Sequence, residues 1–206
     1  QTINWYSSIK WCNARSEKEG LTPCYTVSGA TYKTGANNSV VCNWNANGYR
    51  LPSEAEWEKA ARGGVNGARF PWAMNSITHN QANYLSSTND SYDISPTRGF
   101  HPSYYTGALT FPYTSPAGSF DANGYGMHDM AGNVREWCWD WYASNYYFDG
   151  AIDPRGASGS GYRVVRGGDW GSGGYYCRAA HRLDSAPPSS TNDNKRGFRT
   201  ARSSVP

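Results

Sequence analysis

The fold of this chain is decided by one stretch, Gly124-Tyr125-Gly126-Met127-His128-Asp129-Met130-Ala131-Gly132-Asn133-Val134-Arg135-Glu136-Trp137-Cys138-Trp139-Asp140-Trp141. Its last six residues alternate strictly between tryptophan and a smaller or polar side chain. Because successive side chains of a strand point to opposite faces, this period of two predicts a β-strand. The three tryptophans would share one face, and Glu136, Cys138 and Asp140 would share the other.

Two helices are expected upstream of this strand. The first covers Ile3 to Glu19, where apolar residues recur at helical spacing until Gly20 ends the pattern. The second begins after Ser53, because Ser53 and Glu56 have the spacing of a capping box. Gly63 is expected to end this second helix.

The rest of the chain has the chemistry of short strands and long loops. Residues 70–126 hold many Pro, Gly, Ser, Thr and Tyr without a sustained period, which predicts long loops with short strands. Further strands are predicted at Cys24 to Val27, Ser39 to Trp44, Arg163 to Arg166, Tyr175 to Ala180 and Gly197 to Ala201. Two helices followed by many antiparallel strands predict one α+β domain over residues 1–206.

The segment from Arg163 to Arg202, here called the tail, combines two kinds of sequence. Pieces with strand and turn chemistry alternate with two stretches, Asp169 to Tyr176 and His181 to Asn194, that are rich in Gly, Ser, Asp, Tyr, Pro and Asn. The two stretches show no helical or strand period. Loops held by a rigid scaffold are where binding residues concentrate, so the tail is the first candidate for a binding segment.

Charge and hydropathy exclude several classes of protein. The net charge is +3, and the cationic residues are scattered rather than clustered, which is not the footprint of a nucleic-acid-binding protein. No stretch approaches twenty apolar residues, and no basic segment followed by an apolar one opens the chain. We therefore expect no nucleic-acid partner, no membrane insertion by this chain and no signal peptide within it.

The core is expected to be aromatic. Nine Trp and sixteen Tyr supply much of the apolar surface, and each buried aromatic side chain removes about 150–250 Å² from water. The five cysteines have neither a CxxC pair nor metal-type spacing, and their odd number leaves at least one thiol free. We expect them to pack as small buried apolar groups, and disulfides are the alternative.

Four phrases of the sequence carry a family resemblance: Tyr49 to Glu58, Gly124 to Trp137, Arg166 to Trp170, and Gly197-Phe198-Arg199. Together they closely resemble the formylglycine-generating enzyme (sulfatase-modifying factor) family. The resemblance implies a C-type lectin-like fold with two helices, short antiparallel strands and long loops. Family members usually carry a further N-terminal β-rich part, which this sequence does not include.

The resemblance also implies a test for catalysis. The true oxidases of the family bind copper through two cysteines that follow the Arg-Gly-Gly turn closely, because soft Cu(I) prefers sulfur ligands. Here residues 169–176 contain no thiol, and Cys177 stands alone. The related iron-dependent sulfoxide synthases use a histidine triad, whereas His79, His101, His128 and His181 are far apart in the sequence. We therefore expect no enzyme activity and no copper.

The tail is similar to another group of relatives, the variable proteins of diversity-generating retroelements. These proteins display a mutable C-terminal segment on a lectin-type fold. A mixture of tyrosine with small residues is also typical of antibody paratopes, where Tyr supplies rigid contact area. The predicted ligand-binding residues are Asp169, Trp170, Gly171, Ser172, Gly173, Tyr175, Tyr176, His181, Leu183, Asp184, Ser185, Ser189 and Ser190.

Tyr175, Tyr176 and His181 are the expected anchors among these residues, because their rings both stack and form hydrogen bonds. The leading hypothesis is a non-catalytic display protein with a diversified binding surface. Four alternatives stay open: a copper oxidase of the formylglycine-generating type, a degenerate relative of it, an inert family member with a plain loop, and a carbohydrate-binding lectin.

A structural calcium ion is the one cofactor that the resemblance implies. Asp129, the backbone carbonyls of Gly132 and Val134, and Glu136 match positions where the family binds calcium, and oxygen ligands suit this hard cation. The alternative is that Glu136 pairs with an arginine. Asn83 and Tyr84 match the start of a second family calcium site, whose later acidic ligand would be Asp90 or Asp93.

Partner and location follow from the display hypothesis alone. The expected ligand is a protein or glycan on a host or neighbouring cell, and its identity is not encoded in a recognisable motif. Display requires the outside of a cell or particle, so we expect an extracellular or cell-surface location on a bacterium.

Overall fold

The computed structural model describes residues 3–105, 107, 113–146, 152–159, 161–186, 188–189 and 194–203. These residues form the α+β fold that the sequence predicts, with two α-helices and short strands joined by long loops. No helix in these ranges has the length and the apolar character that a membrane span requires.

Both helices form over the predicted segments, although α1 begins at Trp5 rather than at Ile3. Helix α1 (Trp5–Lys18) is capped by Asn4, whose side chain accepts a hydrogen bond from the Ser7 backbone. Helix α2 (Glu54–Arg62) begins with the capping box of Ser53 and Glu56. It ends at Gly63, which takes the left-handed conformation at φ 56° that glycine adopts without strain.

Within the described residues, nine short strands form three sheets. The first sheet has the order β2-β1-β3, from β1 (Tyr25–Val27), β2 (Ala30–Thr31) and β3 (Val41–Cys42). The second pairs β4 (Tyr49–Arg50) with β9 (Ala201–Arg202). The third has the order β7-β6-β5-β8, from β5 (Arg135–Trp141), β6 (Arg163–Arg166), β7 (Leu183–Ala186) and β8 (Arg196–Gly197). All the pairings are antiparallel except that of β5 with β8.

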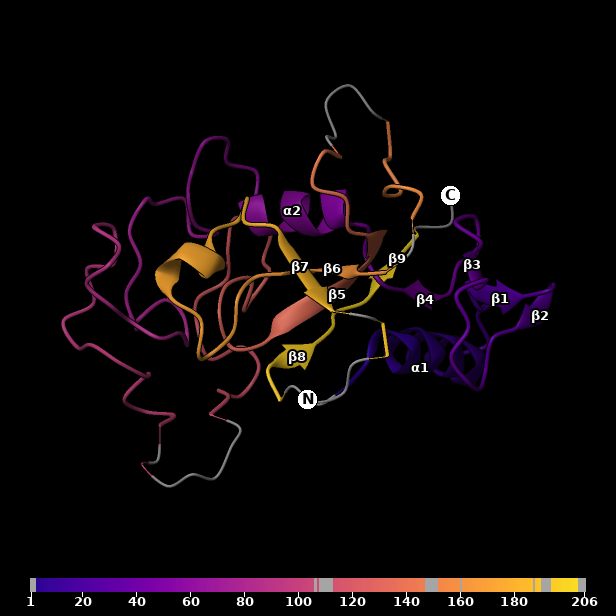
Figure 1. The fold of residues 1–206 in the computed structure, drawn as a ribbon, viewed down its shortest axis with the longest axis horizontal. Helices are drawn as coiled ribbons and strands as arrows, with labels where there is room; N and C mark the ends of the chain where they lie inside the picture. The colour runs from indigo at the N-terminus through magenta and orange to yellow at the C-terminus, as the bar shows by residue number, and fades with distance from the viewer. Residues whose placement is uncertain are drawn as a thin grey trace.

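Strand β5 is the predicted alternating strand, and it lies in the middle of the largest sheet, with neither face open to solvent. Figure 1 shows α2 above this sheet and α1 below it. Cys138 packs into a core cluster with Trp57 of α2, while Trp137 joins the cluster around Trp5 of α1. The polar positions are buried as well: Asp140 is 1% exposed, and its carboxylate accepts a hydrogen bond from the first backbone N–H of α2.

Strand β6 is attached to the core around α1 by a buried cation. Arg163 is 1% exposed, and its guanidinium lies 3.6 Å from the ring centre of Trp5 and 3.5 Å from that of Trp141. Burial lowers the pKa of Arg163 to about 9. Since the ring faces supply partial negative charge to the cation, the aromatic core predicted from composition also holds a charged side chain.

Three predictions about the tail need correction. Residues 175–180 do not form a strand, because Gly174–Cys177 is a 3₁₀-helix (η1) that turns the Cys177 side chain into the core. The loop after His181 was expected to lack strands, but β7 pairs there with β6. The predicted strand over Gly197 to Ala201 is split, since β8 joins β5 and β9 joins β4.

The cysteines are buried thiols, as the sequence predicts. All five are free, and Cys12, Cys24, Cys138 and Cys177 are fully inaccessible to solvent. Cys42 is half-buried and packs against the same cluster as Cys12 and Cys24. Burial raises the pKa of each thiol, to about 12 for Cys42. These side chains act as small apolar groups in the core.

Candidate functional site

Two arginines fix the tail to helix α2. Arg166, at the end of β6, is fully buried and pairs with Glu54 and Glu58. Arg182, just before β7, makes two charge-assisted hydrogen bonds to Glu54, at 2.7 and 2.8 Å. The Arg166 guanidinium also donates to the backbone carbonyl of His181. Both ends of the segment between β6 and β7 are therefore held against one helix.

The Arg-Gly-Gly turn brings η1 close to the end of β6. Gly168 has a φ of 72°, a conformation that glycine adopts without strain. A Cβ atom at Gly168 would lie 2.9 Å from the Cys177 Sγ and 3.1 Å from the Tyr176 carbonyl oxygen. Only glycine lets the chain pass this close to η1, which explains why the turn needs that residue.

Asp169 lies beneath the loop and holds its shape. The side chain is fully buried and pairs with Arg135 of β5. Its two oxygens also accept hydrogen bonds from the Gly171 backbone and the Ser172 hydroxyl, both at 2.8 Å. With its carboxylate turned inward, Asp169 positions the loop and presents no group to solvent.

Three rings form an exposed cluster just after this loop, here called the ring cluster. Tyr175 and Tyr176 are 45% and 42% exposed, and each packs edge-on against His181, with ring centres 4.8 and 5.1 Å apart. The Arg178 guanidinium lies 3.8 Å from the ring centre of Tyr175. Exposed aromatic side chains that support one another in this way offer rigid contact area at low entropic cost.

His181 is neutral at physiological pH. Burial and the nearby charges of Arg178 and Arg166 lower its pKa to about 4. Its Nε2 atom has no hydrogen-bond partner among the described residues. This nitrogen is itself buried, so a ligand at the ring cluster would meet the exposed rings of Tyr175 and Tyr176 first, with the uncharged imidazole packed behind them.

An open cleft of about 660 Å³, here called the tail cleft, lies beside the ring cluster. One side comes from the tail, through Gly171, Ser172, Gly173, Tyr175 and Tyr176. The other side comes from Leu85, Ser87, Asn89 and Asp90, with Arg135 of β5 in the lining. None of these five was among the predicted ligand-binding residues, although Asp90 was named as a candidate calcium ligand and the long loop that contains four of them was predicted.

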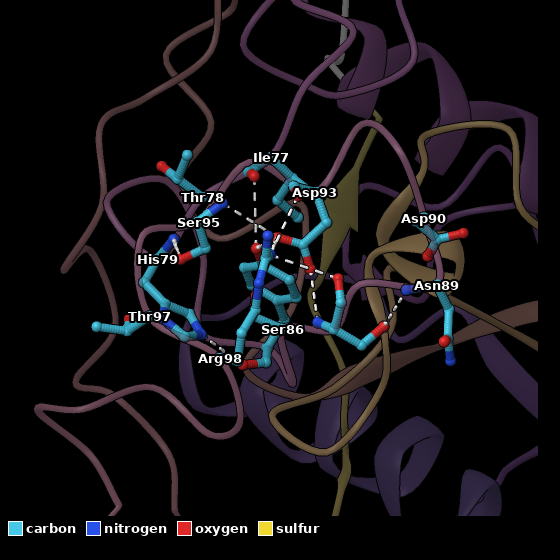
Figure 2. A network of polar contacts seen from close by, with 12 residues as sticks. Ile77, Thr78, His79, Ser86, Asn89, Asp90, Asp93, Ser95, Thr97 and Arg98 are labelled. Carbon is cyan, nitrogen blue, oxygen red and sulfur yellow. Dashed lines mark hydrogen bonds and ion pairs between the residues drawn. The ribbon is translucent and has the colours of Figure 1, made fainter.

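A buried carboxylate holds the second wall in place, as Figure 2 shows. The Asp93 side chain accepts hydrogen bonds from the Tyr84 hydroxyl, the Ser86 hydroxyl and the Ser87 backbone at 2.7 to 2.9 Å. Arg98 adds a contact of 3.1 Å. With its oxygens surrounded by donors, Asp93 organises the loop, and Asn89 and Asp90 lie at the edge of the network.

The predicted ligand-binding residues separate into three groups. Gly171, Ser172, Gly173, Tyr175 and Tyr176 line the tail cleft, and His181 packs beside it. Asp169 and Trp170 are buried below it, at 0% and 2% exposed. The remaining residues are Leu183, Asp184 and Ser185, whose backbone forms β7, Ser189, which is exposed, and Ser190, which lies outside the described residues.

Ser189 does not share the tail cleft. Its neighbour Pro188 accepts a hydrogen bond from the backbone of Trp5, at the start of α1, with 3.1 Å between the two atoms. Since α1 and η1 lie on different sides of the sheet in Figure 1, the segment after β7 returns toward α1. The tail therefore presents its residues on more than one face.

At the predicted calcium site, Glu136 is paired with an arginine. Arg199 contacts both oxygens of the Glu136 carboxylate, at 2.5 and 2.7 Å, and the Trp57 indole donates to it at 2.7 Å. The positive charge of Arg199 occupies the place where a cation would neutralise Glu136. This arrangement is the alternative that the sequence left open.

The other predicted calcium ligands lie in the turn before β5. One Asp129 oxygen accepts a hydrogen bond from the Gly118 backbone at 2.6 Å, and the second is buried without a partner among the described residues. Gly132 is buried, and Val134 is half-buried. No cluster of three or more His, Cys, Asp or Glu side chains suited to a metal occurs in the described ranges. The residues as arranged fit an ion pair better than a cation, and calcium stays a prediction.

The model of the sulfatase-modifying factor enzyme 1-like domain matches residues 1–204. The chain belongs to this family. A formylglycine-generating enzyme from Thermomonospora curvata is 38% identical over 161 residues, which are 75% of this chain and 49% of that protein. The chaperone protein LppX from Paenibacillus barcinonensis is 34% identical over 184 residues, which are 82% of this chain and 58% of that protein. The chain thus spans about half the length of these relatives.

Solved structures give the same family fold. Treponema denticola variable protein 1 superposes with a TM-score of 0.72 at 32% identity, over 98% of this chain and 70% of that one. CarF superposes with a TM-score of 0.68 at 26% identity, over 98% of this chain and 66% of that one. The resemblances to the formylglycine-generating enzyme family and to a variable protein, both predicted from the sequence, are confirmed.

This member of the sulfatase-modifying factor family presents no reactive thiol near the tail cleft. Cys177 is fully buried, and both burial and the nearby Asp169 raise its pKa. Cys12, Cys24 and Cys42 belong to the core cluster of α1, while Cys138 belongs to that of α2. A thiolate is the metal ligand and the nucleophile, and burial disfavours the thiolate form of each of these cysteines.

Proposed function

We propose that the chain is a non-catalytic ligand-binding domain whose tail loops form a binding face that differs between copies of the protein. One observation carries this proposal: the exposed ring cluster stands at the edge of the tail cleft, on a scaffold fixed by buried ion pairs. Exposed Tyr beside Gly and Ser suits a face whose ligand changes with its sequence. The likeness to a variable protein supports the same function.

The rival function is oxidation of a cysteine by a copper site of the formylglycine-generating type. The identity with formylglycine-generating enzymes favours it. It requires two thiolates at one place, and the buried, protonated cysteines speak against it. Copper-dependent oxygen uptake in the presence of a cysteine-bearing sulfatase peptide would support the oxidase and would contradict a display role.

The ligand in this proposal is a protein or glycan on a host or neighbouring cell, and the domain acts outside the cell that makes it. A lectin would instead bind glycans through the Asp129 to Glu136 turn. Glycan binding that survives replacement of Tyr175 and Tyr176 but is lost on calcium removal would favour the lectin.

Diversification is tested in the gene. We expect a near-identical repeat of the tail-coding segment nearby, differing only at template adenines, together with a reverse transcriptase gene. The expected differences fall at codons for loop residues such as Tyr175 and Tyr176, while those for Arg166 and Gly168 are constant. Absence of both the repeat and the reverse transcriptase would leave the domain with a fixed ligand.

Binding is tested with a Tyr175→Ala, Tyr176→Ala double variant. Against a partner recovered by cell-surface display selection with the wild-type domain, we expect the affinity to fall by about 2 kcal/mol or more, as for anchor residues at interfaces. Because both rings are exposed, we expect unfolding by urea to change little. Tyr162→Ala is the matched control, since Tyr162 is 52% exposed and lies outside the tail cleft. A double variant that binds like the wild type contradicts the assignment of this face.

A further inference from the structure

A second cleft of about 610 Å³, here called the basic cleft, shares no lining residue with the tail cleft. It is lined by β4, β9 and the first turns of α2, together with Trp44 and residues 153–155. In Figure 1, β4 and β9 lie to the right of η1 along the long axis of the molecule. The proposed binding function of the tail makes no use of this cleft.

Positive charge predominates in the basic cleft. Its lining includes four cationic side chains, Arg50, Lys59, Arg155 and Arg202, and only two carboxylates, Glu56 and Asp153. Glu56 is already neutralised by Arg50, through two hydrogen bonds of 2.6 Å. Lys59, Arg155 and Arg202 form no ion pair within the part of the chain that the structure describes. The cleft therefore carries an excess of about two positive charges.

Aromatic rings hold three of these cations in position. Arg50 and Arg155 both stack on Trp44, with guanidinium carbons 4.8 and 5.0 Å from the ring centre. Arg202 lies 5.8 Å from the ring centre of Tyr49, its pairing partner between β4 and β9. A guanidinium that rests on a ring keeps its N–H donors directed outward from its edge. The donors of this cleft are thus preorganised before any ligand arrives.

One buried donor lacks a partner. Arg50 is 5% exposed, and its Nε has no hydrogen-bond acceptor among the described residues. A buried N–H without an acceptor is costly, and this one belongs to a side chain that lines the basic cleft. This observation is independent of the count of charges in the lining.

We propose that the basic cleft binds a small molecule that carries a phosphate group. A phosphate has a charge of about −1.5 to −2 near neutral pH and three strong acceptor oxygens, which match the charge excess and the arginine donors. A carboxylate would neutralise only half of the excess. A space of about 610 Å³ is far larger than a phosphate ion needs, so the anion is one end of a larger ligand.

The test is isothermal titration of the wild-type domain with glucose 6-phosphate, inorganic phosphate, sulfate and glucose at constant ionic strength. We expect saturable binding of glucose 6-phosphate, weaker binding of phosphate, and none of glucose. An Arg155→Gln, Arg202→Gln double variant should bind glucose 6-phosphate at least tenfold more weakly. Sulfate that binds as well as phosphate would argue against a phosphate site.

A matched control removes two positive charges elsewhere. The Lys10→Gln, Lys33→Gln double variant alters cations that do not line the basic cleft, and it should bind within twofold of the wild type. Urea unfolding of both variants checks that the fold is retained. If the wild type shows no saturable binding, or if both variants lose affinity equally because the anion is only adventitious, the proposal is wrong. Replacing Tyr175 and Tyr176 should leave this binding unchanged, so the two proposals fail separately.

Discussion

Asp90 accepts a hydrogen bond from the backbone N–H of Tyr175, with 3.1 Å between Oδ2 and N. This contact joins a loop outside the tail to the first residues of η1. It links the two walls of the tail cleft at the point where the ring cluster begins. The orientation of Tyr175 therefore depends on a residue that is 85 positions away in the sequence.

Asp90→Ala tests this link. The variant removes the carboxylate that accepts a hydrogen bond from the Tyr175 amide, so we expect faster hydrogen exchange at that amide and a loss of about 1 kcal/mol in the free energy of unfolding. Mass spectrometry or NMR measures the exchange. Asn89→Ala, in the same exposed loop, is the control and should leave the Tyr175 amide unchanged. Equal protection in Asp90→Ala and the wild type would remove Asp90 from this role.

Asp93→Ala tests the polar network under the second wall. Removal of the carboxylate leaves the buried hydroxyls of Tyr84 and Ser86 without their acceptor, and we expect the free energy of unfolding to fall by about 3 kcal/mol or more. Urea denaturation measures the loss. Asp121→Ala, at an exposed acidic position, should change stability by less than about 0.5 kcal/mol. Equal effects of the two substitutions would show that Asp93 does not organise the wall.

His181 gives stability a predictable pH dependence. Its pKa is about 4 in the fold and 6.5 as an unperturbed group, so the unfolded chain takes up a proton first as pH falls. The folded state therefore loses stability between pH 6.5 and 4, and the loss is complete below the folded pKa. Above pH 6.5 the imidazole is neutral in both states and contributes no pH dependence.

His181→Asn isolates this contribution. Subtracting its stability profile from that of the wild type cancels other groups, including Asp140, whose burial raises its pKa to about 7 and which acts in the opposite direction. We expect the difference between the two proteins to change between pH 6.5 and 4 and to stay constant from pH 7 to 8. Chemical denaturation at each pH supplies the data. A constant difference across the whole range would mean that His181 titrates normally in the fold.

Calcium is tested at the Arg199 ion pair. Because Arg199 already neutralises Glu136, we expect chelation with EGTA to leave the thermal midpoint of the wild type unchanged. Arg199→Gln should lose about 3 kcal/mol of stability, since it leaves a largely buried carboxylate unpaired. Added calcium should restore part of that loss in the variant alone. A wild-type midpoint that falls on chelation would instead support the predicted calcium site.

The ends of helix α2 and the central strand β5 were predicted correctly because their sequence signals act over a few neighbouring residues. The capping box at Ser53 and the glycine at position 63 act within one helix, so their meaning does not depend on distant residues. The alternation from Glu136 to Trp141 likewise identified β5. The alternation also placed Glu136, Cys138 and Asp140 on one face of β5, but it did not show that this face is buried. Asp140 lies inside the protein, where it accepts a hydrogen bond from the first backbone N–H of α2.

The tail shows where local reasoning fails. Tyr175 to Ala180 has a strand-like composition, but Gly168 and the buried Cys177 impose a 3₁₀ turn. β7 exists because β6 offers it a partner, which no local period could reveal. The side of the tail cleft that contains Asp90 was not predicted for the same reason, because the contact between Asp90 and Tyr175 joins residues far apart in the sequence. The long loop around it was the available signal, since such loops in compact domains are usually functional.

The loop between β6 and β7 begins and ends at arginines that share Glu54. Its two ends are therefore a fixed distance apart, whatever sequence connects them. For a flexible connection, doubling the number of residues adds only about 0.6 kcal/mol to the cost of closing the loop. Away from the buried Asp169, Trp170 and Cys177, the scaffold should consequently accept insertions in this loop nearly as readily as substitutions, so engineered variants of the binding face could differ in reach as well as in chemistry.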